Sequence, residues 1–170
     1  MTVPSGLREI DETPQVKLLR ADASSAGDAA RGWAEGGLTV RILRGQKMRS
    51  TGSLFDEVAA ALQFPHYFGE NWPAFDECLS DMDWLLPCSG IVLLVLNAAK
   101  VLADEPGNEL TTLIRVFAKA SREYAVEIDR GEWWDRPALP FHVVLQATDE
   151  IARLEDAWRT AGAETAMLDS

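Results

Sequence analysis

The stretch Ile91-Val-Leu-Leu-Val-Leu96 decides the fold class, because every one of its six positions is apolar. A strand of this composition is buried on both faces, which is typical of a parallel sheet with helices above and below it. Outward from this stretch, strand patterns and helix patterns alternate along the chain. We therefore predict an α/β fold with a short parallel sheet of three central strands covered by helices. The strands are predicted at 38–43, 91–96 and 141–146, and the main helices at 23–35, 51–62, 109–125, 149–160 and from residue 72 onward.

The 170 residues suit one domain in three consecutive parts. Residues 1–36 are predicted to form an N-terminal arm with a strand and a helix, and residues 1–15 are polar and expected to be loose. Residues 37–147 hold the three central strands. Residues 148–170 supply a helix and an edge strand that pack on the same domain. The two terminal additions therefore allow one or two extra edge strands.

Composition narrows the classes of partner. The formal net charge is −11, which argues against direct binding to nucleic acid and favours a basic partner. The two cysteines lack the spacing of a zinc or redox site, and the longest apolar run is far too short for a membrane helix. We expect a reduced, soluble, cytoplasmic protein, monomeric when free, with no membrane contact, no metal and no cofactor.

Charge is distributed unevenly along the chain. No Lys or Arg occurs from Ser50 to Ala99, whereas this segment holds seven acids, five of them between Glu70 and Asp83. On a helix that Asn71 caps, with Pro73 in its first turn, helical spacing buries Phe75, Cys78, Leu79 and Met82. The same spacing places Pro73, Asp76, Glu77 and Ser80 on another, exposed face, near the aromatic residues Tyr67, Phe68, Trp72 and Trp84.

Aromatic side chains beside unpaired carboxylates are typical of a protein-binding surface. The alternative is a plain solvated helix face, on which acids near the N-terminus are favoured by the helix dipole. The missing counter-charge favours binding, because a surface selected only for stability mixes both signs.

The stretch Tyr67-Phe-Gly-Glu-Asn-Trp-Pro-Ala-Phe-Asp-Glu-Cys-Leu79 resembles the signature of the barstar family, small intracellular inhibitors of bacterial ribonucleases such as barnase. The resemblance covers roughly residues 37–147, which makes this part a barstar-like domain, and residues 127–140 look like an insertion. Pro73 stands where the family has its first Asp, Glu77 where it has the Asp before the cysteine, and Lys119 at a position that is acidic in its well-known member.

The resemblance implies a non-enzymatic, stoichiometric inhibitor that blocks the active site of a basic bacterial ribonuclease or toxin nuclease. An acidic helix would mimic the phosphates of the substrate. The Ala variants of Asp76 and Glu77 are then expected to weaken binding strongly with little effect on stability. The alternative is an acidic adaptor or regulatory module of the same fold that binds a basic partner other than a nuclease. The predicted partner-binding residues are Tyr67, Phe68, Asn71, Trp72, Pro73, Asp76, Glu77, Ser80, Asp81 and Asp83.

Other chemistry has little support in the sequence. The only histidines, His66 and His142, have no Ser or Cys in a triad context, so we expect no catalytic residue. There is no Gly-rich phosphate loop, and Asp81-Met-Asp83 lacks the glycine and terminal Glu of a calcium loop. Trp133-Trp134 in the polar insertion is either an added contact or a loop anchor, and the sequence leaves both open.

Overall fold

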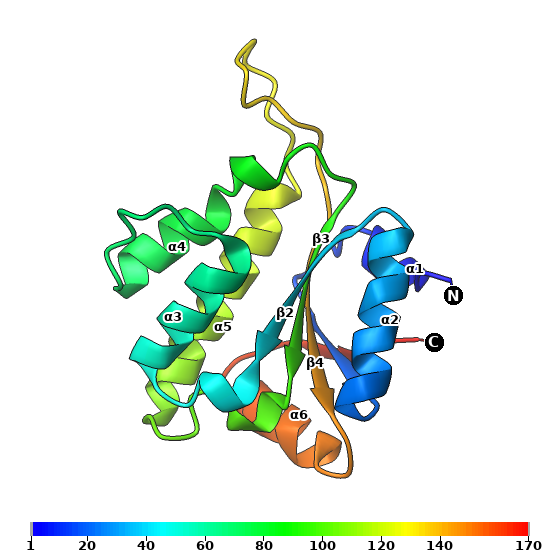
Figure 1. The fold of residues 1–170 in the computed structure, drawn as a ribbon, viewed down its shortest axis with the longest axis vertical. Helices are drawn as coiled ribbons and strands as arrows, with labels where there is room; N and C mark the ends of the chain where they lie inside the picture. Colours follow the sequence, from blue (N-terminus) through cyan, green and yellow to red (C-terminus); the bar gives the residue numbers. More distant parts are fainter. Residues whose placement is uncertain (1, 170) are drawn as a thin grey trace.

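The computed structural model describes residues 2–169, and its centre is a five-stranded sheet in which every neighbouring pair of strands is parallel. The spatial order of the strands is β2-β3-β4-β1-β5 (Figure 1). Because parallel neighbours need crossover connections, helical segments link most of the strands. The strands are β1 (Val16–Arg20), β2 (Thr39–Arg44), β3 (Ile91–Leu96), β4 (Phe141–Ala147) and β5 (Thr165–Met167).

The predicted α/β fold with a parallel sheet is confirmed, but the sheet is larger than three strands. Both terminal parts of the chain add strands on the same side of β4. β1 lies between β4 and β5 and is therefore an interior strand, not an edge strand as predicted. The C-terminal strand β5 pairs with the free side of β1, so the backbone groups of β1 are bonded on both sides.

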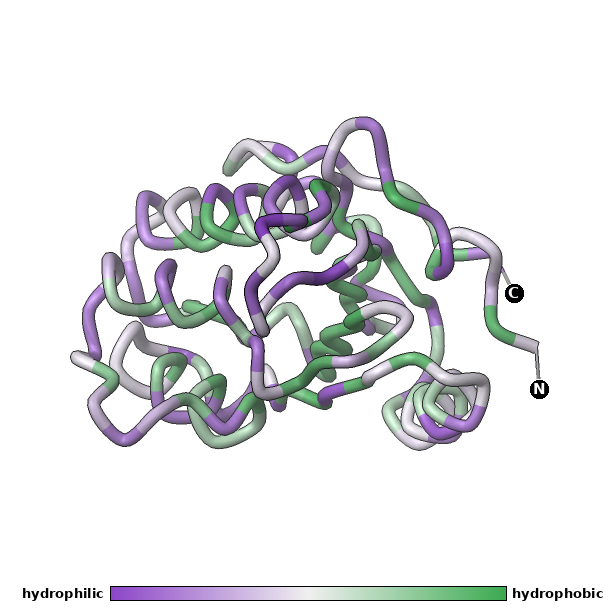
Figure 2. The backbone as a smooth tube through the Cα atoms, turned by 90° about the horizontal axis from the view of Figure 1, so that it is seen from above, coloured by the Kyte–Doolittle hydropathy of each residue, from purple (hydrophilic) through white to green (hydrophobic). Residues whose placement is uncertain are grey.

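Helices cover both faces of the sheet, so the molecule has three layers. Figure 1 places α3, α4 and α5 on one face, α1 and α2 on the other, and α6 beside the lower end of the sheet. Seen from above, the middle of the molecule is hydrophobic and its outer parts alternate in hydropathy (Figure 2). The helices are α1 (Ser5–Arg8), α2 (Ala23–Glu35), α3 (Thr51–Leu62), α4 (Trp72–Ser80), α5 (Gly107–Tyr124) and α6 (Ile151–Thr160), with short 3-10 turns η1 (Gly45–Lys47), η2 (Asp83–Leu85) and η3 (Ala98–Lys100).

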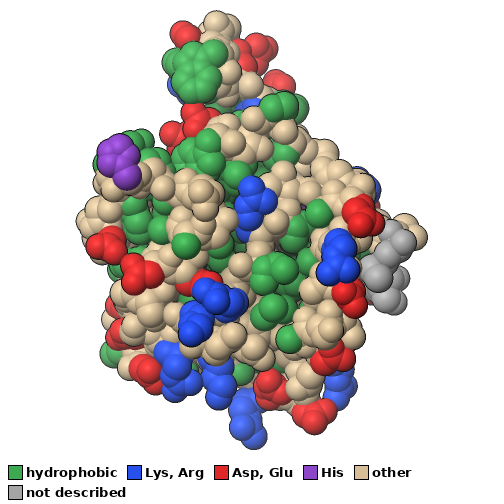
Figure 3. All heavy atoms as spheres, viewed as in Figure 1, with side chains coloured by type: hydrophobic (Ala, Val, Ile, Leu, Met, Phe, Trp, Pro, Cys, Tyr) green, Lys and Arg blue, Asp and Glu red, His purple; other side chains and the backbone are tan. Residues whose placement is uncertain are grey.

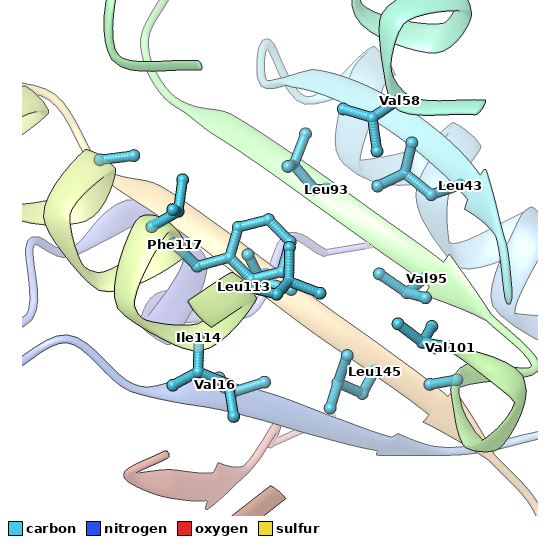
Figure 4. Packing of buried hydrophobic residues seen from close by; sticks show 14 of the residues in the cluster. Val16, Leu43, Val58, Leu93, Val95, Val101, Leu113, Ile114, Phe117 and Leu145 are labelled. Atoms are coloured by element: carbon cyan, nitrogen blue, oxygen red, sulfur yellow. The ribbon is translucent and has the colours of Figure 1, made fainter. Parts of the chain in front are cut away.

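Strand β3 is buried on both faces, as its sequence predicts. Leu93 and Val95 point into the larger hydrophobic core, which also holds Leu43 from β2 and Leu113 from α5 (Figure 4). Val92 and Leu94 belong to the smaller core under α2. Alternate side chains of one strand thus stabilise opposite layers.

The first fifteen residues are not a loose arm, which corrects the prediction. Leu7 is fully buried beneath α2, and Arg8 Nη2 donates to the Gly36 carbonyl at 2.8 Å. Further along, the Glu9 carbonyl accepts a hydrogen bond from Nε2 of the buried His142 at 2.8 Å. Apolar and polar contacts together therefore fasten this segment to the sheet.

No helix within residues 2–169 combines the length and the apolar composition that crossing a membrane requires.

Candidate protein-binding surface

The start of helix α4 is fixed by Asn71, as the sequence predicts. Asn71 Oδ1 accepts a hydrogen bond from the Ala74 N–H at 2.9 Å, and Asn71 Nδ2 donates to the Gly69 carbonyl at 3.1 Å. Pro73 lies in the first turn, where a missing N–H costs little. Glu70 adopts a left-handed backbone conformation with φ of 51°, which turns the chain into the helix. The loop and the helix start therefore form one connected unit.

An aromatic cluster anchors the loop in front of α4. Its rings stand mostly edge to face, with centroids 5.1–6.0 Å apart. Trp72 is part of this cluster, and its Nε1 donates to Glu109 Oε2 at 3.0 Å, so its indole supports the loop from within. Because the loop is held in the free protein, little ordering remains to oppose binding. The cluster consists of Phe55, Phe64, Phe68, Trp72 and Phe75.

Two aromatic side chains of this region remain open to solvent. Tyr67 is 75% exposed at the tip of the loop, and Trp84 is 37% exposed in η2. Trp84 Nε1 donates to the Leu62 carbonyl at 2.8 Å, which fixes the ring in place. Tyr67 and Trp84 line a shallow hollow of about 110 Å³ together with Glu77 and Asp81. Exposed rings and carboxylates thus meet at one place.

The acids that were expected to lack partners are not all unpaired, because the fold supplies cations from outside the acidic segment. Asp76 Oδ2 lies 2.7 Å from Lys119 Nζ on α5, and Glu57 pairs with Arg44 on β2 at 2.7 Å. The hydrogen bond to Asp76 raises the pKa of Lys119. Ser80 also turns toward this side, with its hydroxyl 3.4 Å from Asp76 Oδ1. Asp76 and Ser80 therefore face α5.

Four carboxylates of the predicted region make no ion pair within residues 2–169. Partial burial raises the pKa of Asp81, and the like charges of Asp83 and Glu77 raise it further. A carboxyl group whose neighbours disfavour its charge gains stability when a cation approaches. The four residues are Glu70, Glu77, Asp81 and Asp83, and we call them the free acid row.

Tyr124 of α5 holds the end of α4 in position. Its hydroxyl donates to the Leu79 carbonyl at 2.9 Å and accepts from the Met82 N–H at 3.0 Å. Burial raises the pKa of this phenol well above its usual range, so the hydroxyl stays protonated. The sequence offers a single signal for this role, a Tyr at the end of the apolar stripe on α5.

The histidines and Cys78, the other residues considered for catalysis, do not form a catalytic arrangement. His66 is exposed beside Tyr67, with ring centroids 5.6 Å apart, and His142 is buried in β4. Burial raises the pKa of the Cys78 thiol, so this cysteine is not an activated nucleophile. Nowhere in residues 2–169 do three or more His, Cys, Asp or Glu side chains gather in a way that would hold a metal ion.

Fold and surface together define a layered α/β protein with a five-stranded parallel sheet. Over residues 38–146, more than half of its length, the chain matches the family model described as Barstar (barnase inhibitor). The chain belongs to the barstar family. No curated protein sequence matches it.

Two solved structures are similar in fold. Cdc6p from Pyrobaculum aerophilum has a TM-score of 0.56 at 16% identity, over 96% of this chain and 41% of that chain. A chain of Drosophila ORC bound to DNA has a TM-score of 0.52 at 13% identity, over 94% of this chain and 82% of that chain. The protein thus spans less than half of the Cdc6p chain, and at these identities the likeness concerns the fold alone.

Proposed function

We propose that the protein is a stoichiometric, non-enzymatic inhibitor of a basic bacterial ribonuclease or toxin nuclease, and that it acts in the cytoplasm. The observation that carries the proposal is the free acid row beside Tyr67 and Trp84, within the barstar-family part of the chain. In the complex, its carboxylates occupy the positions of substrate phosphates and pair with Arg and Lys of the nuclease. No nucleic acid binds directly.

Electrostatics support this role. Unpaired carboxylates of like sign on and after α4 repel one another in the free protein, and this repulsion adds to partial burial in raising the pKa of Asp81. A cationic active site relieves this repulsion and is attracted from a distance, so association is fast at low salt and slower at high salt. The anchored loop limits the entropy lost on binding.

The predicted contact residues divide into four groups by position. Glu77, Asp81 and Asp83 provide free charge, while Tyr67 and Phe68 provide the adjoining aromatic rim. Asn71, Trp72 and Pro73 shape the helix start, and we assign them mainly to holding the surface in place. Asp76 and Ser80 face α5, so their contribution is smaller than the sequence alone suggests.

Titration into a panel of small basic bacterial ribonucleases tests the proposal. Loss of RNA cleavage at one-to-one stoichiometry, weakened by salt, is the expected result. The double variant Glu77→Gln, Asp81→Asn should weaken inhibition about 30-fold or more. The double variant Asp28→Asn, Glu35→Gln on the exposed side of α2 removes the same number of charges and is the matched control, and its inhibition should stay unchanged. Equal losses in the double variant and the control would show that the free acid row is not the contact.

Lys119→Met tests the same surface with a change that is expected to strengthen binding. Removal of this cation frees Asp76 and adds one unpaired carboxylate beside Glu77. Binding to a basic nuclease should become tighter and more sensitive to salt. Binding that weakens would instead place Lys119 itself in the contact.

The alternative function is an acidic adaptor for a basic partner that is not a nuclease, because the free acid row would attract any strongly basic protein surface. Absence of inhibition across the panel, together with a captured partner that lacks a nuclease fold, would favour the adaptor.

A further inference from the structure

The insertion after α5 forms a defined hairpin that projects beyond the rest of the fold (Figure 1). Ile128 and Arg136 exchange two backbone hydrogen bonds, of 2.9 and 3.0 Å, as an antiparallel pair. At the tip, the carboxylate of Asp135 accepts from the N–H groups of residues 130, 131 and 132 at 2.8–3.2 Å. Residues 126–137, which we call the Trp hairpin, therefore have their own internal support.

Arg136 fastens the base of the Trp hairpin to α5. Its guanidinium lies 5.0 Å from the centre of the Tyr124 ring and donates to the carbonyls of Glu123 and Val126 at 3.0 and 2.9 Å. Two further carbonyls, of Tyr124 and Pro137, accept from the same side chain. Its donors are thus engaged by backbone carbonyls, which leaves this cation little capacity to receive an outside carboxylate.

The two tryptophans of the Trp hairpin are left in water. Trp133 is 79% exposed and Trp134 38%, with their rings edge to face at a centroid distance of 5.5 Å. Figure 3 shows hydrophobic side chains on this projection with acidic side chains around them. An exposed indole contributes little to folding, whereas buried in an interface it is among the most effective contact groups. The exposure therefore points to a contact made with another molecule.

A pocket of about 350 Å³ opens between the Trp hairpin and the segment that follows α4. Its walls are largely apolar, with both indoles on one side. Asp83 lies at this pocket and makes no ion pair within residues 2–169, whereas Asp135 is occupied by the hairpin's own N–H groups. The other lining residues are Leu86, Pro87, Cys88, Arg136, Pro137 and Leu139, and the guanidinium of Arg136 is engaged by the backbone carbonyls at the base of the hairpin.

We propose that this pocket receives an arginine side chain of a protein partner. Its apolar walls suit the aliphatic stem, the indole faces suit a planar guanidinium, and Asp83 supplies the opposing charge. Arginine fits better than lysine, because it stacks on aromatic rings and pairs with a carboxylate through two donors. Asp83 also ends the free acid row, so the pocket extends that surface.

The choice of partner rests on the proposed function, but the pocket is tested separately. Titration of the full-length protein with an arginine hexapeptide, followed by NMR of the tryptophan Nε1–H signals, should shift the signals of Trp133 and Trp134. A citrulline hexapeptide, the uncharged analogue, should shift neither, and a lysine hexapeptide should bind more weakly.

Charge-matched variants separate the pocket from general attraction between opposite charges. Asp83→Asn and Trp133→Ala should each weaken binding of the arginine peptide about tenfold, whereas Asp129→Asn should not. Asp129 is exposed on the same hairpin but does not line the pocket, so it is the matched control. Equal losses for Asp83→Asn and Asp129→Asn, or unmoved tryptophan signals, would overturn the proposal.

The two proposals fail in different ways. Binding of the arginine peptide without inhibition of any ribonuclease keeps the pocket and rejects the nuclease as its partner. If Trp133→Ala and Asp83→Asn inhibit a ribonuclease as strongly as the parent protein does, the pocket is not part of the contact. The proposal that the protein is a ribonuclease inhibitor then still holds.

Discussion

Substitution of Tyr124 by Phe tests whether α5 holds the acidic helix in place. The ring is 1% exposed and stacks on Phe141 with the planes 15° apart, so Phe retains the packing. Only the hydroxyl is lost, together with its bonds to the Leu79 carbonyl and the Met82 N–H.

The size of the effect follows from these two bonds. Each hydrogen bond contributes about 1 kcal/mol net, and a buried group left without a partner costs about 1–3 kcal/mol. Since Leu79 and Met82 are both fully buried, water cannot readily replace the hydroxyl. Tyr124→Phe should therefore lower the free energy of unfolding by about 2–4 kcal/mol, which corresponds to roughly 5–15 °C in Tm for a chain of this size.

Urea unfolding followed by circular dichroism measures this difference, and amide exchange at Met82 reports on the local site. The other tyrosine provides a matched control. Tyr67 is 75% exposed, so Tyr67→Phe should change the free energy of unfolding by less than about 0.5 kcal/mol. A Tyr124→Phe variant as stable as this control, with unchanged exchange at Met82, would refute the assigned role.

Three further predictions concern stability. Gly45→Ala should cost more than about 2 kcal/mol, because the added Cβ would lie 2.6 Å from the Leu96 carbonyl oxygen, whereas Gly27→Ala has open space and should be neutral or stabilising in the same urea experiment. Burial lowers the pKa of His142 in the folded protein below the value of about 6.5 in the unfolded chain. Between these two pKa values the unfolded chain binds more protons, so the free energy of unfolding falls as the pH is lowered. His142→Gln should reduce this pH dependence in thermal scans from pH 7 to 5. Since partial burial and the like charges of Asp83 and Glu77 raise the pKa of Asp81, Asp81→Asn should stabilise the free protein at pH 7 by a few tenths of a kcal/mol while weakening its binding. A loss of stability would contradict this account of Asp81.

Periodicity and capping predicted the local structure around the site. The Asn71 cap, the first-turn Pro73 and the buried Phe75 and Leu79 are all confirmed, because each depends on residues three or four apart in the sequence. The strand Ile91–Leu96 was also predicted from local sequence, because a short unbroken apolar run is typical of a strand that is covered on both faces.

Contacts between elements that are distant in the chain could not be predicted from the sequence. Lys119 lies 43 residues from Asp76, and a helical pattern on each element does not specify which of its polar residues face the other helix. Burial of Val3 and Leu7 was missed because two apolar residues separated by Pro4 and polar neighbours are too few to define a helical stripe. The interior place of β1 also depends on sheet order, and a strand pattern contains no information about order.

Aromatic and acidic side chains lie together on the surface that the sequence predicted, but fewer of its carboxylates lack an ion pair than the sequence suggests. Its uneven pairing has a physical meaning. Lys119 pairs with Asp76 and Arg44 with Glu57, whereas Glu77, Asp81 and Asp83 make no ion pair within residues 2–169, and the nearby charge of Arg136 offsets only part of what raises the pKa of Asp81. One exposed Lys nearby would relieve that repulsion, and surfaces that serve only stability mix charge signs in this way. Under the proposed function, this arrangement disfavours the free protein and favours a complex with a cationic partner.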